Sequence, residues 1–344
     1  MQACIIMSKI EELLSQKILI LDGAMGTMLQ EYRFSEKDFR GDRFTDWPVP
    51  LQGNNDLLSI TQPRAIADIH RKYFLAGADI VETNTFSSTR IAMADYQMQE
   101  LVYELNFESA RIAKEVAKEL SAQNPEKPRF VAGAMGPTNK TASMSPDVND
   151  PGYRAVSFKE LQEAYKEQAK ALIDGGVDIL LVETVFDTLN AKAALFAIDE
   201  LKEELKLDIP VMISGTITDA SGRTLSGQTA EAFMISVSHI PLLSIGFNCA
   251  LGAKQLTPHL EVLSQKSGYA VSAYPNAGLP NAFGEYEQSP KEMARQTREY
   301  LEKGLVNIVG GCCGTTPEHI KAIAEVAQNY SPRIIKKNPQ PQNL

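Results

Sequence analysis

One local pattern, a helix that ends in glycine and leads directly into a buried strand, occurs three times along this chain. The amphipathic segments end near Gly77, Gly176 and Gly304, and apolar runs follow at 80–83, 179–184 and 305–309. Glycine suits the left-handed residue that closes a helix. An uninterrupted apolar run is typical of a parallel strand that is covered on both faces. The pattern therefore predicts repeated helix–strand units around a parallel sheet.

Eight apolar runs of strand length alternate with helical patterns over most of the chain. They lie near 17–22, 79–83, 129–134, 178–183, 210–215, 243–248, 268–273 and 305–310. Eight such units over about 320 residues predict an α/β fold, a (β/α)8 TIM barrel. A doubly wound sheet would alternate in the same way, but no G-x-G-x-x-G follows the first strand and no phosphate-binding G-x-x-x-x-G-K-[ST] occurs.

The same patterns predict the limits of the barrel. We expect a tail with a short leading helix at 1–16, the barrel at 17–330, and a linker-like tail at 331–344, where Pro, Asn and Gln replace the helical period. The polar stretch between Thr27 and Thr61 is too irregular for a single helix, and we expect a long loop or insertion there.

Charge and hydropathy exclude several classes of partner. The 344 residues carry 34 basic and 43 acidic side chains, a net charge of -9, without the clustered Lys and Arg of a nucleic-acid site. No apolar run approaches the roughly 18 residues of a membrane span, and residues 1–9 lack a signal-peptide core. Four cysteines in a chain of this length do not form a disulfide scaffold. We therefore expect a cytoplasmic protein with reduced thiols and neither a nucleic-acid nor a membrane partner.

Two adjacent cysteines follow the last predicted strand, in Gly310-Gly311-Cys312-Cys313-Gly314, and Cys249 follows the sixth. The carboxyl ends of barrel strands share one rim, where barrel enzymes carry their active sites. Three thiolates there suit Zn²⁺, which binds sulfur at about 2.3 Å. Cys4 lies in the tail and no histidine falls close, so we expect three cysteine ligands and an open position. The alternatives are buried hydrophobic thiols, a structural metal, or a rare vicinal disulfide between Cys312 and Cys313.

An open position beside three thiolates favours one kind of chemistry. Zinc removes the proton of a coordinating thiol near neutral pH. Three thiolate ligands leave excess negative charge, which keeps the bound sulfur nucleophilic, whereas a water-activating hydrolase more often uses neutral histidines. The pattern therefore indicates alkylation of a thiol.

Other polar residues are predicted at the same rim. Asp22 and Glu183 end the first and fourth strands and could bind a substrate ammonium group, or could be helix caps or salt-bridge partners. The turn at Gly23–Thr27 could offer backbone N–H groups to a carboxylate at a helix start, or could be only a tight turn. The remaining rim candidates, each as readily structural as functional, are Glu82, Asn84 and Asn276.

With these residues in place, the chain closely resembles the N-terminal homocysteine-binding module of cobalamin-dependent methionine synthases, in the homocysteine S-methyltransferase family. The wider family, including betaine–homocysteine methyltransferases, shares the first and last motifs, whereas the middle motifs are more like the cobalamin enzymes. The resemblance extends over roughly residues 17–328. It rests on Leu21–Thr27, Gly53–Leu58, Glu82–Phe86, Thr141–Pro146, Asn248–Gly252, Pro275–Pro280 and Gly310–Gly314.

The resemblance implies a catalytic zinc held by Cys249, Cys312 and Cys313, with the sulfur of homocysteine in the fourth position. It places the amino-acid end of homocysteine near the residues Asp22, Gly23, Ala24, Met25 and Glu183. Methylcobalamin would donate the methyl group and methionine would leave.

The resemblance also implies partner modules. The chain contains no Asp-x-His-x-x-Gly of the family's cobalamin-binding type, because the sequence at Asp68-Ile69-His70 lacks the glycine. Cobalamin-binding and folate-binding modules would therefore act in cis or in trans. Two alternatives remain at this point: a standalone methyltransferase using a small donor such as S-methylmethionine or betaine, and a non-catalytic, zinc-stabilised binding barrel.

Overall fold

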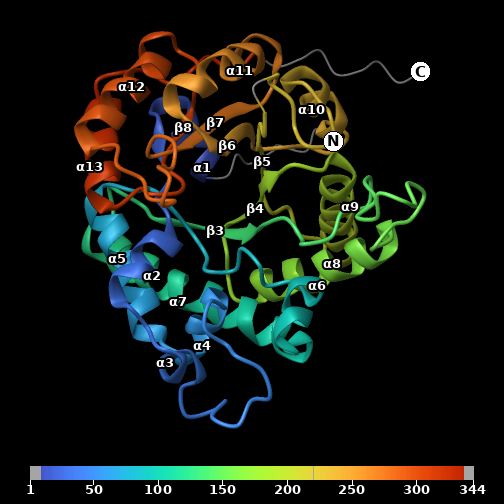
Figure 1. Cartoon of the computed structure of the whole chain (residues 1–344). Coiled ribbons are helices and arrows are strands. Elements are labelled where there is room, and N and C mark those ends of the chain that lie inside the picture. The colour runs from blue at the N-terminus through green and yellow to red at the C-terminus, as the bar shows by residue number, and fades with distance from the viewer. Residues whose placement is uncertain (1–8, 220, 337–344) are drawn as a thin grey trace.

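The computed structural model describes residues 9–219 and 221–336, and shows eight parallel strands surrounded by helices (Figure 1). The sheet order is β1-β8-β7-β6-β5-β4-β3-β2, and a bridge between Leu21 and Ile80 joins β1 to β2. This arrangement confirms the predicted (β/α)8 TIM barrel. The strands are β1 (Leu19–Ile20), β2 (Ile80–Glu82), β3 (Phe130–Met135), β4 (Ile179–Val185), β5 (Val211–Gly215), β6 (Ser244–Gly252), β7 (Ala270–Asn276) and β8 (Ile308–Val309).

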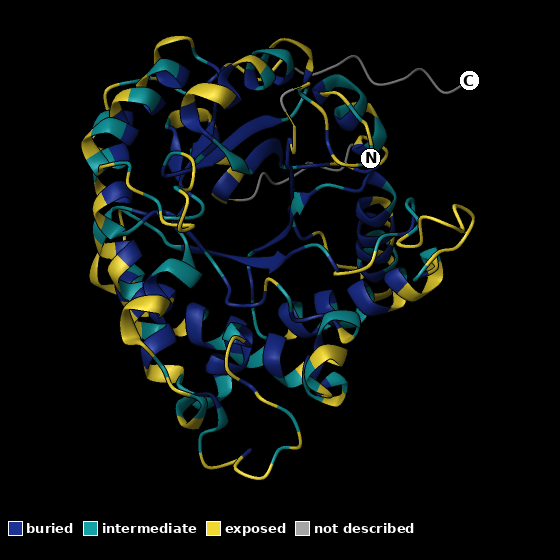
Figure 2. Cartoon of the chain, in the orientation of Figure 1, coloured by how far each residue is buried: buried dark blue, intermediate teal, exposed yellow. Residues whose placement is uncertain are grey.

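One long helix follows each strand and covers the outside of the barrel. The inward faces of these helices are buried together with the strands, while their outer faces alternate between exposed and intermediate residues (Figure 2). The three predicted cap glycines have positive φ angles, +123° at Gly77, +93° at Gly176 and +59° at Gly304. The covering helices are α5 (Pro63–Ala76), α7 (Val102–Gln123), α8 (Phe158–Asp174), α9 (Thr188–Leu205), α10 (Ala230–Val237), α11 (Ala253–Lys266), α12 (Pro290–Glu302) and α13 (Pro317–Ala327).

A polar residue just before a strand recurs in the three units that contain a cap glycine. Asp79, Asp178 and Asn307 each turn a side-chain oxygen onto the neighbouring strand. Their backbone donors are the N–H groups of Ile20 at 3.0 Å, Val131 at 2.9 Å and Val271 at 2.9 Å. These three contacts therefore fix strand pairing at the amino-terminal end of the barrel. They do not involve the carboxyl rim, where the predicted site residues lie.

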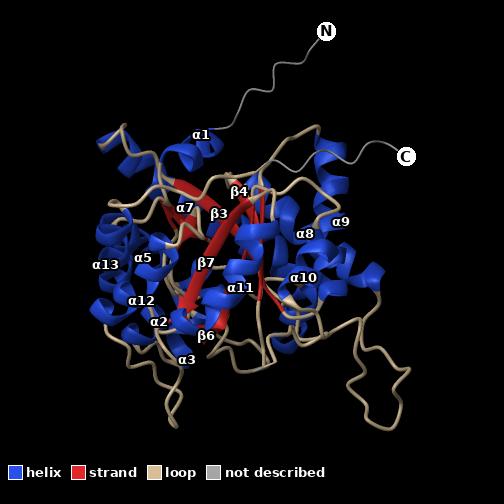
Figure 3. Cartoon of the chain, turned by 90° about the horizontal axis from the view of Figure 1, so that it is seen from above, coloured by secondary structure: helices blue, strands red, loops and turns tan. Residues whose placement is uncertain are grey.

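The helix α1 (Lys9–Gln16) lies at one end of the barrel (Figure 3). Its buried residues Ile10 and Leu14 join the apolar cluster of the barrel interior, which includes Leu19 and Tyr274. The remainder of the predicted tail, residues 1–8 with Cys4, lies outside the described residues. None of the helices in the described part of the chain combines the length and apolar character needed to cross a bilayer.

The stretch from Thr27 to Thr61 is more ordered than the predicted loop. It contains α2 (Met25–Tyr32), α3 (Glu36–Arg40), the 3-10 turn η1 (Asn55–Leu57) and α4 (Leu58–Thr61). Ser35 and Asp38 form a capping box on α3, and Asn54 caps η1. These helices are too short to show a helical period, so local capping rather than periodicity defines them.

Three short elements precede α7 on the rim: α6 (Arg90–Met93), η2 (Ala94–Tyr96) and η3 (Gln99–Leu101). At the other end of the chain, the backbone remains attached to the barrel beyond α13. The buried side chain of Arg333 donates to the backbone oxygens of Ser264, Ser267 and Tyr269. Barrel contacts therefore continue to Arg333, while the domain boundary at 330/331 stays a prediction. Residues 337–344 lie outside the described residues.

Candidate metal centre and substrate site

The three predicted cysteines meet at the carboxyl end of the barrel. Cys249 lies in β6, and Cys312 and Cys313 follow β8. The Sγ atoms of Cys249 and Cys313 are 3.7 Å apart, those of Cys312 and Cys313 are 4.0 Å apart, and all three lie within 4.8 Å of one another. All three are free thiols, so the structure does not contain the vicinal disulfide considered as an alternative.

This spacing suits a single tetrahedral ion. Four ligands at about 2.3 Å from zinc lie about 3.8 Å from one another, close to the sulfur separations of 3.7 and 4.0 Å. The three side chains are half-buried, so a metal held by them would be shielded on one side and reachable on the other. The residues present therefore fit Zn²⁺ with three protein ligands.

A local distortion of β6 carries Cys249. Cys249 and Ala250 have φ angles of +58° and +52°, and the pairing of β6 with β7 shifts register between Asn248 and Gly252. A left-handed residue other than glycine costs roughly 1–2 kcal/mol. Two such residues in succession mark a strained segment, as is common where side chains are aimed at a functional site. Sequence patterns do not show this bend, because neither residue is a glycine.

The loop that carries Cys312 and Cys313 is held by the end of β7. The N–H of Cys312 donates to Pro275 O at 2.8 Å, and the N–H of Cys313 donates to Asn276 Oδ1 at 3.1 Å. Asn276, a predicted rim contact, is buried and positions the backbone of a metal-ligand candidate.

Tyr286, in the loop between β7 and α12, also reaches this site and was not identified from the sequence. Its hydroxyl accepts a hydrogen bond from Asn276 Nδ2 at 3.5 Å, and it lies near enough to Cys313 to lower the pKa of that thiol. Hydrogen bonds from Cys249, Cys312 and then Tyr286 lower the pKa of Cys313 to about 3. Cys313 is therefore the sulfur of the three that most readily carries negative charge. A tyrosine in a long irregular loop gives no sequence signal for this contact.

Three carboxyl groups lie together near the thiols. Asp22 and Glu183 are buried, and Asp22 Oδ2 accepts the N–H of Glu82 at 3.1 Å. Burial and the charge of Glu82 raise the pKa of Asp22 well above its ordinary value. Burial, followed by the charges of Glu82, Asp22 and Cys313, does the same for Glu183. Burial raises the pKa of Glu82 to about 8.

Among the described residues, Glu82 Oε1 is buried without a hydrogen-bond partner. A buried carboxylate that lacks a partner is costly. A cation placed among the three acids would relieve both the missing contact and their mutual repulsion. The arrangement is therefore suited to an ammonium group.

The turn after β1 is held by a hydrogen bond to Thr315, in the loop that follows β8. Ala24 N donates to Thr315 Oγ1 at 3.1 Å, so this predicted amide donor already has a partner. The next residue, Met25, begins α2, and no side chain caps that helix start. Gly23 cannot be larger, because a Cβ there would lie 2.6 Å from Thr315 Oγ1.

Asn84, a predicted rim contact, makes hydrogen bonds within the protein scaffold. Its amide donates to Asn55 O at 2.8 Å and to Ser59 Oγ at 3.1 Å. These bonds attach the end of β2 to the segment between Thr27 and Thr61. Both amide protons are used, so Asn84 has no donor left for a ligand in this conformation.

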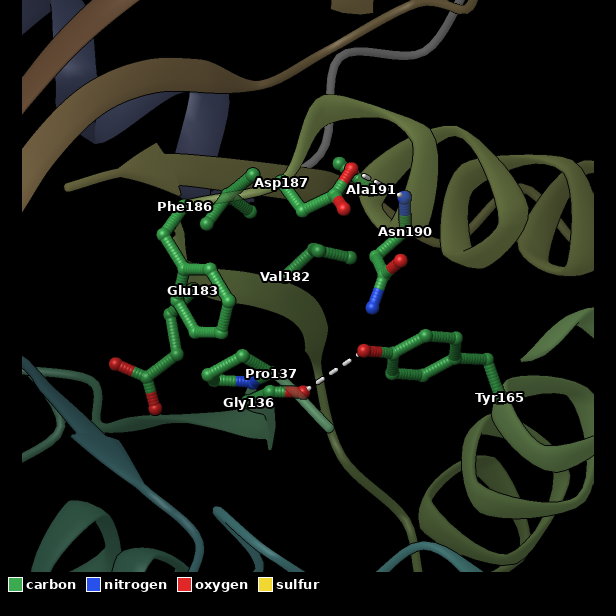
Figure 4. Close-up of a pocket in the computed structure, with 10 residues that line it drawn as sticks. Gly136, Pro137, Tyr165, Val182, Glu183, Phe186, Asp187, Asn190 and Ala191 are labelled. Carbon is green, nitrogen blue, oxygen red and sulfur yellow. Dashed lines mark hydrogen bonds between the residues drawn. The ribbon is translucent and has the colours of Figure 1, made fainter. Parts of the chain in front are cut away.

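A pocket lies beside β4, between the ends of β3 and β4 and the start of α9 (Figure 4). Tyr165 and Asn190 lie on one side of it, and the carboxyl group of Glu183 points away from them. The Tyr165 hydroxyl donates to Gly136 O at 3.1 Å. The Glu183 carboxyl group therefore points out of this pocket, and the pocket is not assigned to the substrate.

A TIM barrel whose carboxyl rim gathers three free thiols and three neighbouring acids, two of them buried, has the architecture of a barrel enzyme that acts on a thiol. Residues 19–327 match the family model described as homocysteine S-methyltransferase. The chain belongs to this family and is a methyltransferase, as the sequence resemblance predicts.

Solved structures with the same fold include three of the homocysteine methyltransferase MmuM from Escherichia coli. The metallated and oxidized forms are each 23% identical to this chain with a TM-score of 0.69, and the apo form is 22% identical with a TM-score of 0.66. Each match covers 91% of this chain, and 98%, 97% and 97% of the respective MmuM chains. At this identity the likeness supports the fold.

Proposed function

We propose that this protein is a zinc-dependent homocysteine S-methyltransferase in which Cys249, Cys312 and Cys313 hold the metal. The observation that carries the proposal is the set of three sulfur atoms at tetrahedral spacing beside a cluster of buried acids. Bound there, Zn²⁺ would keep the homocysteine sulfur, as its fourth ligand, deprotonated and nucleophilic at neutral pH. The thiolate accepts a methyl group and leaves as the thioether of methionine.

The chain's own residues orient the amino-acid end of homocysteine. Asp22, Glu82 and Glu183 bind the ammonium group, which supplies the cation that their burial and mutual repulsion favour. The N–H groups of Gly23 and Met25, at the uncapped start of α2, bind the carboxylate. Ala24 supports this turn through its bond to Thr315. Fixing both ends of the substrate orients its sulfur for an in-line transfer.

We infer that the methyl donor is methylcobalamin carried by another module or chain. The loop that carries Tyr286 also exposes two apolar side chains, Phe283 and Leu279, which are 88% and 53% exposed. Apolar residues exposed in a loop that reaches the metal site favour a donor presented on a protein surface. We place the reaction in the cytoplasm, where the three thiols stay reduced.

X-ray absorption of the zinc-loaded protein, with and without homocysteine, tests the central claim. We expect three sulfur ligands and one lighter ligand in the free protein, and four sulfur ligands after homocysteine is added. A metal environment that homocysteine leaves unchanged would instead support the non-catalytic, zinc-stabilised barrel.

A separate assay tests the donor. Methionine formation from homocysteine is measured with methylcobalamin, S-methylmethionine and betaine in parallel reactions. We expect turnover with methylcobalamin. Turnover with a small donor and none with methylcobalamin would replace our donor assignment, while leaving homocysteine methylation intact.

A further inference from the structure

The side chain of Asn248, directly before Cys249, connects the thiols to the acids. It is fully buried in β6, and every hydrogen-bonding position of its amide is used. Oδ1 accepts the N–H of Thr184 at 3.1 Å and the hydroxyl of Ser214 at 2.7 Å. Nδ2 donates to Thr184 Oγ1 at 2.8 Å and to Cys312 Sγ at 3.9 Å.

The orientation of this amide is determined by its surroundings. Exchanging its oxygen and nitrogen would turn an NH₂ group toward the backbone N–H of Thr184, which can only donate. Nδ2 must therefore point toward Cys312. An N–H directed at a metal-ligand sulfur stabilises the thiolate form and restricts where that sulfur can lie.

The same amide, through both its oxygen and its nitrogen, holds an unusual conformation in β4. Thr184, the residue after Glu183, has a φ of +53°, and the pairing of β4 with β5 shifts register between Val182 and Val185. A β-branched residue in this region is strained. Two hydrogen bonds between Asn248 and Thr184, one donated by the Thr184 N–H and one by Asn248 Nδ2, hold Thr184 there. This bend lies directly after Glu183.

We propose that Asn248 is a positioning residue that fixes the separation between the Cys312 sulfur and the Glu183 carboxyl group, and thereby selects an amino thiol of the length of homocysteine. The inference rests on the proposed function, because it takes the thiol to bind at the metal and the ammonium group at the acids. Cysteine is one methylene shorter and cannot reach both positions in a rigid site. One methylene is typically worth 10–200-fold in such discrimination.

Asn248→Asp separates the two halves of the amide. The aspartate keeps an oxygen for Thr184 N–H and Ser214, but replaces Nδ2, which donates to both Thr184 Oγ1 and Cys312 Sγ, with an acceptor. The matched control is Asn307→Asp, the same change in a buried asparagine at the opposite end of the barrel. A second variant, Thr184→Val, removes the hydroxyl that accepts from Asn248 and leaves the asparagine in place.

Two measurements without a methyl donor test the proposal. Zinc affinity is measured by chelator competition, and binding of homocysteine and of cysteine is followed by the sulfur-to-cobalt charge-transfer absorption of the Co²⁺-loaded protein. We expect Asn248→Asp to weaken zinc binding at least about tenfold and to reduce the preference for homocysteine over cysteine by about tenfold. Thr184→Val should reduce the preference and leave zinc affinity within about threefold.

The proposal is overturned if Asn248→Asp matches Asn307→Asp in both measurements. If circular dichroism shows that Asn248→Asp does not fold, Thr184→Val decides, and an unchanged preference in that variant rejects the role. Failure of the proposed function gives a different result: the wild-type Co²⁺ spectrum would not respond to homocysteine, while the zinc affinities would still test the contact with Cys312.

Discussion

The sulfur atoms of Cys249 and Cys313 lie 3.7 Å apart, although 64 residues separate them in the chain. Their strands, β6 and β8, flank β7 in the barrel. A regular strand would not by itself direct the two side chains to one point. The left-handed backbone at Cys249 and the loop held by Asn276 accomplish this. The metal site therefore depends on irregular backbone placed on a regular scaffold.

Removing one of these sulfurs should abolish metal binding without unfolding the barrel. Cys312→Ala leaves two thiols for an ion that normally has four ligands, so we expect loss of stoichiometric zinc and at least about a thousandfold loss of activity. Cys312 lies outside the paired strands, and it is a half-buried neighbour of the apolar cluster inside the barrel rather than one of its buried members. Metal analysis together with circular dichroism measures both effects. Global unfolding of the variant would show that the metal is structural.

Much of the scaffold could be predicted because buried parallel strands have a direct sequence signature. The apolar runs and the glycines at 77, 176 and 304 indicated both the barrel and the shared rim on which Cys249, Cys312 and Cys313 meet. These features depend on local sequence, on hydrophobic periodicity and on the known geometry of the fold.

The remaining contacts could not be predicted because they depend on irregular backbone and on loop paths. The sequence marked Asn248 only as part of the Asn248–Gly252 motif. Its proposed positioning role depends on its hydrogen bond to the strained residue Thr184, which lies in another strand. Tyr286 reaches Cys313 from a loop without periodicity. The short helices between Thr27 and Thr61 were missed because capping rather than an apolar stripe defines them.

Neutralising Glu183 should weaken homocysteine binding. A hydrogen bond to a charged group contributes about 1.5–3 kcal/mol, so Glu183→Gln should raise the KM for homocysteine roughly 10–100-fold. Zinc content should not change, because the carboxyl group is not among the metal-ligand candidates. Steady-state kinetics checks the effect against Glu163→Gln, a substitution on the exposed face of α8. Equal KM values in the two variants would remove Glu183 from the substrate site.

Homocysteine binding should depend on pH through Glu82. The pKa of Glu82 is about 8 because the group is buried, so this carboxyl group is mostly protonated at pH 7 in the free protein. An ammonium ligand favours the carboxylate and lowers that pKa, so a proton is released on binding. Affinity should therefore rise as the pH increases from about 6.5 to 8, and level off above the pKa of the free protein.

Calorimetry in buffers of different ionisation enthalpy counts the released protons at pH 7. Glu82→Gln cannot release a proton from this position, so we expect up to about one proton fewer than in the wild type. The thiol contributes equally to both proteins. Without the charge of Glu82, the pKa values of Asp22 and Glu183 are also lower in the free variant, so these acids release fewer protons and change the difference in the same direction. Identical proton counts would mean that the ammonium group binds elsewhere.

The contact between Tyr286 and Cys313 should stabilise the metal site. Tyr286→Phe keeps the ring but removes the hydroxyl that lies near Cys313 and lowers the pKa of that thiol. Partners of metal ligands typically contribute 10–100-fold to metal affinity, and because this contact is a single bond from a half-buried loop we expect a loss near tenfold. Chelator competition measures it.

A matched control and a second variant distinguish this contact from a general effect of the loop. Tyr103→Phe also removes a tyrosine hydrogen bond, to Asp174 at 2.6 Å on the outer surface, and should leave zinc affinity unchanged. Gly314→Ala acts through the backbone, since Gly314 has a φ of +77° and an added Cβ would lie 2.2 Å from Tyr286 Cβ. The ring would have to move, so Gly314→Ala should weaken zinc binding at least as much as Tyr286→Phe and lower the free energy of unfolding by roughly 1–3 kcal/mol. If Tyr286→Phe and Tyr103→Phe bind zinc equally well, the hydroxyl of Tyr286 does not support the metal site.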